Sequence, residues 1–167
     1  MYLLLFFLFS CYNLYIYHYK KEKFLAICAF FGHRNFPYKQ YENKISDYIM
    51  ELIKENGVTQ FYSGFRGDFD RLCAEIVHKI KSAYPNIINT MVLSYYPNTD
   101  FILPSVFDDS VYLLEEKVPP RFAISYTNRK IVDLSDYIIS GTILHTGGAA
   151  AACAYAASKS KIILSIF

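Results

Sequence analysis

Three glycine-bearing turns carry the residues of this sequence that are best suited to bind an anion. They are Gly32-His33-Arg34, the stretch from Gly64 through Gly67 to Asp70, and Gly147-Gly148-Ala149. Glycine lets a phosphate approach the backbone closely, and a helix that begins just beyond it offers free N–H groups and the positive end of its dipole. The three turns together predict a phosphate-binding rim in which Arg34 acts as a bidentate clamp.

Two roles are open to Asp70 and two to His33. Asp70 is placed to accept a hydrogen bond from a ribose hydroxyl, or to cap the apolar helix that starts beside it. His33 is placed to contact a ligand, or to bond to the backbone as a structural residue. Glu75 lies five residues beyond Asp70, and its alternative role is that of an ordinary charge on a solvated helix face.

Arg129 and Asp136 are further candidates for contact with the ligand. Arg129 is followed by Asp133 at the i+4 position, so an internal ion pair with Asp133 or Asp136 is the competing interpretation. Guanidinium groups match the geometry of a phosphate. We therefore predict that Arg34 and Arg129 hold an anionic ligand in the rim.

The elements that must position these residues alternate along the chain. Apolar runs at 24–31, 58–63, 87–95, 137–142 and 161–167 predict strands, whereas 41–56, 70–83, 123–133 and 149–159 have helical spacing. A short helix is expected within 109–116. This alternation predicts an α/β, Rossmann-like three-layer fold with a mainly parallel sheet and helices on both faces. The glycine turns would then share the carboxyl ends of the strands, where such sheets bind ligands.

Composition restricts the class of protein and of partner. A length of 167 residues suits one domain, and 17 Lys and Arg against 15 Asp and Glu give a net charge of only +2. A protein that grips duplex phosphates needs a far more basic surface, so we expect no duplex nucleic acid. The four cysteines contain no C-x-x-C pair, and the histidines have no metal-ligand spacing. We therefore expect no metal site and a cytoplasmic protein with reduced thiols.

The first 22 residues form a separate, apolar N-terminal segment. Residues 1–17 are uncharged and are followed by Lys20, Lys21 and Lys23. This length is the lower edge of a membrane span, and the lysines would keep the following domain on the cytoplasmic side. A membrane anchor and a gene start placed too far upstream both fit. The working domain is expected at 23–167, with a membrane as a partner only through 1–17.

Four ordered motifs resemble the YpsA-like branch of the SLOG superfamily (SMF/DprA–LOG). They are FFGHRNF (30–36), FYSGFRGDFDRLCAEIV (61–77), TNRKIVDLSDYII (127–139) and GGAAAACAYA (147–156), so the match covers about 24–167. The resemblance implies a Rossmann-like fold with a pocket for a nucleotide or a nucleotide-derived small molecule, without a cofactor. The ligand-binding residues would be Gly32, His33, Arg34, Gly64, Gly67, Asp70, Arg129, Asp136, Gly147 and Gly148.

The last motif departs from the hydrolase members of that superfamily. LOG phosphoribohydrolases carry P-G-G-x-G-T-x-x-E, whose glutamate works with an arginine on the N-glycosidic bond, whereas 147–154 here contains no carboxylate. Alanine methyl groups neither stabilise an oxocarbenium-like centre nor activate water. We therefore predict a nucleotide-binding or sensing protein without that hydrolase activity. The alternative is an enzyme that acts on a glycosidic or phosphate linkage through Asp70, Glu75 or Asp136.

Overall fold

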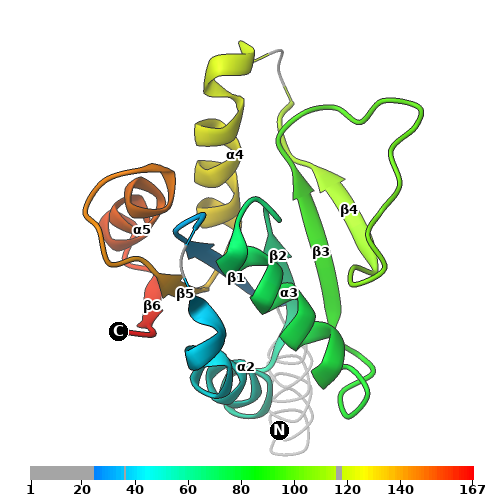
Figure 1. Cartoon of the computed structure of the whole chain (residues 1–167), viewed down its shortest axis with the longest axis vertical. Helices are drawn as coiled ribbons and strands as arrows, with labels where there is room; N and C mark the ends of the chain where they lie inside the picture. Colours follow the sequence, from blue (N-terminus) through cyan, green and yellow to red (C-terminus); the bar gives the residue numbers. More distant parts are fainter. Residues whose placement is uncertain (1–24, 36, 116–117) are drawn as a thin grey trace, which may run out of the picture.

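Six parallel strands form one sheet in the computed structural model, which describes residues 25–35, 37–115 and 118–167 (Figure 1). The strands are β1 (Ala26–Gly32), β2 (Val58–Ser63), β3 (Ile88–Leu93), β4 (Asp109–Tyr112), β5 (Tyr137–Gly141) and β6 (Ile162–Ser165), in the spatial order β4-β3-β2-β1-β5-β6. Every neighbouring pair is parallel. The expected α/β, Rossmann-like fold is confirmed.

The strand order reverses at β1. The chain moves outward from β1 through β2 and β3 to β4, and β5 then returns to the other side of β1, where Gly32 pairs with Gly141. Loops that follow β1 and β5 must therefore diverge to opposite sides of the sheet. Such a switch point leaves a crevice at the carboxyl ends of the strands.

Four α-helices cover the two faces of the sheet in the described part of the chain (Figure 1). Helices α2 (Glu42–Asn56) and α3 (Asp68–Ile80), with the 3-10 turn η1 (Tyr38–Tyr41), pack on one face. Helices α4 (Pro120–Leu134) and α5 (Gly148–Ser158) pack on the other. Successive side chains of β1 point to opposite faces of the sheet. Phe30 therefore packs in the core between the sheet and α2 and α3, whereas Phe31 packs in the core between the sheet and α4 and α5. A strand covered on both faces explains the uninterrupted apolar run.

The short helix expected within 109–116 is wrong, because residues 109–112 form strand β4. Asp109 to Tyr112 pair in register with Thr90 to Leu93 of β3. The backbone of Asp108 leads into this pairing, since its N–H donates to the carbonyl oxygen of Asn89 at 2.9 Å. A four-residue segment has too little pattern of its own, and the open edge of β3 decides its conformation.

The expectations for residues 1–22, and for a membrane contact through 1–17, lie outside the described residues. Within the part that the structure describes, no helix combines the length and the apolar character needed to cross a bilayer.

Candidate functional site

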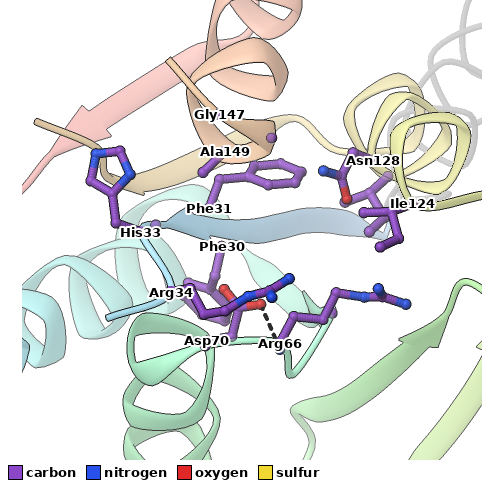
Figure 2. Close-up of a pocket in the computed structure, with 15 residues that line it drawn as sticks. Phe30, Phe31, His33, Arg34, Arg66, Asp70, Ile124, Asn128, Gly147 and Ala149 are labelled. Atoms are coloured by element: carbon purple, nitrogen blue, oxygen red, sulfur yellow. Dashed lines mark hydrogen bonds between the residues drawn. The ribbon is translucent and has the colours of Figure 1, made fainter. Parts of the chain in front are cut away.

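A cavity of about 290 Å³ opens at the carboxyl ends of β1 and β2, beside the starts of α3 and α5 (Figure 2). Its lining residues are Phe30, Phe31, Gly32, His33, Arg34, Gly64, Arg66, Gly67, Asp70, Ile124, Asn128, Ile131, Gly147, Gly148 and Ala149. The structure thus brings the three glycine turns together, with their predicted residues. Arg129 and Asp136 are not among the lining residues.

The first two turns are locked together at Arg34 and Gly67. The backbone N–H of Asp68 donates to the carbonyl oxygen of Arg34 at 2.8 Å. A Cβ atom at position 67 would lie only 2.6 Å from the Cα atom of Arg34, which leaves no space for a side chain. The close approach that requires glycine at this position therefore also fixes where the Arg34 side chain begins.

Two guanidinium groups reach this cavity, those of Arg34 and Arg66. Figure 2 shows both on the side of β1 that faces Asp70, with Asn128 of α4 across the opening. Arg34 is exposed, whereas Arg66 is half-buried with its Cζ atom 5.6 Å from the centroid of the Tyr95 ring. Neither forms an ion pair with a carboxylate of the described residues. Arg66 was missing from the predicted site, although its position inside the second glycine turn is the signal that indicates it.

Asp70 closes its own turn and also lines the cavity. Its Oδ2 atom accepts the backbone N–H of Arg66 at 3.1 Å, so the side chain reaches back from the first turn of α3 to the residue before the N-cap residue Gly67. Burial raises the pKa of the Asp70 carboxyl to about 6, while the Arg66 N–H and the charges of Arg66 and Arg34 act in the opposite direction. The carboxyl group therefore changes charge near neutral pH, next to two arginines.

The starts of α3 and α5 contribute partial positive charge to the same opening. Gly67 and Gly147 are the N-cap residues of these helices, and neither helix has a side-chain cap hydrogen bond. Gly147 has φ = 98°, a backbone conformation that side chains rarely adopt. The first backbone N–H groups of α5 lack partners within the helix, and no acidic residue lies in its first turn, so this start favours an anion. At α3 the Asp68 N–H already donates to Arg34 and the first turn carries Asp68 and Asp70, so this start favours an anion less.

His33 makes the backbone contacts that its structural interpretation requires. Its Nε2 atom accepts the backbone N–H groups of Ile143 and Leu144, each at 2.9 Å. Both bonds need an unprotonated Nε2. The ring therefore fastens the loop after β5 to the end of β1, and it orders the approach to α5 while it lines the cavity.

Arg129 lies in a neighbouring cavity of about 260 Å³, which shares Ile124, Asn128 and Gly148 with the first. The Cζ atom of Arg129 is 5.7 Å from the centroid of the Tyr155 ring. The ion pair considered for Arg129 is not formed with Asp133, whose Oδ1 accepts the hydroxyl of Tyr155 at 2.9 Å. The packing of α4 on α5 places the Arg129 guanidinium beside the Tyr155 ring.

Asp136 lies at the opposite end of the sheet from the cavity. It precedes β5, and its Oδ2 accepts the backbone N–H of Ile27 near the start of β1 at 3.0 Å. Glu75 lines a separate shallow hollow with Lys39 and Arg71. Of the three acidic residues considered for catalysis, the structure thus brings only Asp70 to the cavity.

The fold is similar to solved structures of DNA processing protein A. The structure of that protein from Streptococcus pneumoniae aligns with 84% of this chain and 50% of its own, at a TM-score of 0.59 and 19% identity. The protein from Helicobacter pylori, described with a single-stranded DNA binding mode, aligns with 87% of this chain and 68% of its own, at 0.57 and 22%. The chain therefore spans about half the length of the first neighbour. No protein-family model and no curated protein matches the sequence.

These neighbours correct the predicted partners. The partner predicted from the sequence is a nucleotide or nucleotide-derived small molecule, with no duplex nucleic acid. That prediction conflicts with the similarity to DNA processing proteins, one of which is described by its binding of single-stranded DNA. The prediction relied on a net charge of +2. Net charge averages over the whole surface, whereas a single strand is held by a local groove of cations and by stacking on aromatic rings. The likeness shows the fold alone, so membership of the SLOG superfamily and of its YpsA-like branch stays a prediction.

Proposed function

We propose that this protein binds single-stranded nucleic acid and seats one nucleotide unit in the rim cavity. The phosphodiester would lie against Arg34, Arg66 and the first turns of α3 and α5. The observation that carries the proposal is the pair of guanidinium groups at two helix starts, with neither group in an ion pair with a carboxylate of the described residues. The likeness of the fold to DNA processing protein A supports the choice of a strand.

The size and the acid content of the cavity favour binding of a strand over cleavage. A volume of about 290 Å³ is at the small end for ligand pockets, so it suits one nucleotide unit whose neighbours continue outside. Among the described residues that line the cavity, Asp70 is the only one with a carboxylate. Cleavage of a glycosidic bond ordinarily uses a pair of carboxylates. LOG-type chemistry instead pairs one glutamate with an arginine, and the absence of a carboxylate from 147–154 supports a nucleotide-binding role without it.

The proposal is tested by fluorescence anisotropy with the full chain and labelled twelve-nucleotide strands. We expect saturable binding of oligo(dT) and weaker binding of a duplex of the same length. The logarithm of the association constant should fall linearly with that of the salt concentration, with a slope of about −0.7 for each phosphate neutralised. Oligo(rU) distinguishes a site that reads the sugar from one that reads only phosphate. The absence of saturable binding to either strand by folded protein would refute the proposal.

Asp70 should make this binding dependent on pH. A phosphodiester keeps one negative charge over this range, whereas the Asp70 carboxyl, with a pKa of about 6, becomes neutral as the pH falls from 8 to 5. Loss of a negative charge beside Arg34 and Arg66 favours the anion. Two charges about 10 Å apart in a medium with an effective dielectric constant of about 20 interact by roughly 1.7 kcal/mol, so affinity should rise by about tenfold.

The matched variant for this pH dependence is Asp70→Asn, whose side-chain oxygen can still accept the Arg66 N–H. Its affinity should be high at pH 8 and nearly constant down to pH 5. The pH dependence of the folding stability gives an independent check that the pKa of Asp70 is raised in the folded state. Because the pKa is raised in the folded state, the wild-type protein should lose stability as the pH rises from about 4 through 6, and the variant should lose less. Equal pH profiles for both proteins would exclude Asp70 as the group that titrates.

A further inference from the structure

A second cavity, of about 280 Å³, adjoins the rim over the carboxyl end of β3. It shares Gly64 and Arg66 with the rim cavity, so the half-buried guanidinium of Arg66 stands at the junction of the two. The other lining residues come from the end of β3 and the loop after it, and are Met91, Val92, Leu93, Ser94, Tyr95, Tyr96, Pro97, Asn98 and Phe101. Tyr95, Tyr96 and Phe101 give this cavity an aromatic wall, which meets the site described above through the contact of Arg66 with the Tyr95 ring.

The two tyrosines of this wall are held by their neighbours. The hydroxyl of Tyr95 donates to the carbonyl oxygen of Pro120 at 3.3 Å, while Arg66 lies over its ring. The Tyr96 ring meets that of Tyr112 nearly edge-on, with centroids 5.7 Å apart and an interplanar angle of 82°. Tyr96 nevertheless remains 81% exposed. An aromatic ring that packs against a neighbouring ring and is still largely open to solvent, in a cavity that Arg66 also lines, is suited to stack on another flat ring.

We infer that this second cavity is a stacking subsite for the base of the nucleotide next to the one seated in the rim. The inference rests on the proposed function, since it needs a strand that already occupies the rim. Tyr96 would supply the stacking surface, and Arg66 would stand between that base and the bound phosphodiester. Every base has an aromatic face, so the subsite would tolerate any sequence.

The cavity on the other side of the rim is less suited to a base. Its aromatic residue is Tyr155, whose ring has Arg129 and Lys159 of this chain over it at 5.7 and 5.4 Å. The hydroxyl of Tyr155 is bonded to Asp133. Two cationic side chains of the protein already lie over the Tyr155 ring, whereas no cation of the described residues lies over the Tyr96 ring. The strand is therefore expected to extend from the rim toward β3.

The test compares oligo(dT) of twelve nucleotides with a strand of the same length made of abasic sugar units, which keeps the phosphates and removes the bases. Tyr96→Ala should weaken binding of oligo(dT) by about tenfold, the usual effect of one stacked base, and should leave binding of the abasic strand unchanged. Tyr96→Phe should bind both strands as the wild type does. Tyr126→Ala is the matched control, because Tyr126 is 48% exposed on α4 and lines neither cavity.

The outcomes separate this inference from the proposed function. If the wild type binds oligo(dT) and folded Tyr96→Ala binds it equally well, the stacking subsite is overturned while the proposed function stands. A loss that is equal for oligo(dT) and the abasic strand also overturns the subsite, since it shows no contact with a base. If the wild type binds no strand, the proposed function fails, and the subsite fails with it.

Discussion

Replacement of both Arg34 and Arg66 by alanine is expected to weaken binding of a twelve-nucleotide oligo(dT) by about 100-fold or more. Each hydrogen bond from a guanidinium to a phosphate contributes about 1.5–3 kcal/mol, so loss of two such contacts corresponds to at least 3 kcal/mol. The salt dependence should weaken as well, by about 1.4 units of slope for two phosphate contacts. Fluorescence anisotropy over a series of salt concentrations measures both effects.

The melting temperature of this double variant should change little. Arg34 is exposed and forms no ion pair with a described carboxylate. Truncation of Arg66 removes its interactions with Tyr95, of which the contact with the ring contributes about 0.5–1 kcal/mol, and the attraction between its charge and that of Asp70. Lys54→Ala is the charge control, since Lys54 lies in the last turn of α2, just before β2 begins at the opposite end of the sheet. Arg34→Lys keeps the charge but loses the planar fork, and should fall between the wild type and Arg34→Ala. If the double variant binds oligo(dT) with wild-type affinity, Arg34 and Arg66 do not form the binding site.

Gly67→Ala is expected to lower the free energy of unfolding by about 1–3 kcal/mol and to weaken strand binding together with it. The added methyl group would lie 2.6 Å from the Cα atom and 3.0 Å from the carbonyl oxygen of Arg34, so the backbone of one turn must move. That movement displaces the Arg34 guanidinium from the rim. It also strains the hydrogen bond from the Asp68 N–H to the Arg34 carbonyl.

Gly64→Ala is the matched control for this prediction. Its methyl group would have the Oδ2 atom of Asp70 as its nearest neighbour at 3.5 Å, an ordinary contact, and the φ angle of Gly64 lies outside the positive range that strains a side chain. Urea denaturation should therefore give Gly64→Ala a midpoint close to that of the wild type. Equal midpoints for Gly67→Ala and the wild type would show that the two turns can separate without cost, which contradicts the coupling between them.

Most of the fold could be predicted from the sequence because its signals are local. The apolar run before Gly32 and the helical spacing between Tyr41 and Gly57 each belong to one element. Alternation of strands and helices through short links then requires a parallel sheet, which places the turn after each strand at the same edge. The gathering of the glycine turns at one rim follows from this connectivity alone. Strand β4 is the exception, because its conformation depends on the edge of β3.

The candidate site depended on tertiary structure wherever the direction of a side chain matters. Arg129 belongs to a helix, and only the packing of α4 against α5 turns it toward Tyr155 and away from the rim. Asp136 precedes a strand, so it lies at the amino ends, where it bonds to Ile27. Arg66 and Tyr96 come together because neighbouring strands β2 and β3 end side by side. Sequence patterns determine at which end of the sheet a turn lies, whereas distances between side chains of different turns exist only after the helices have packed.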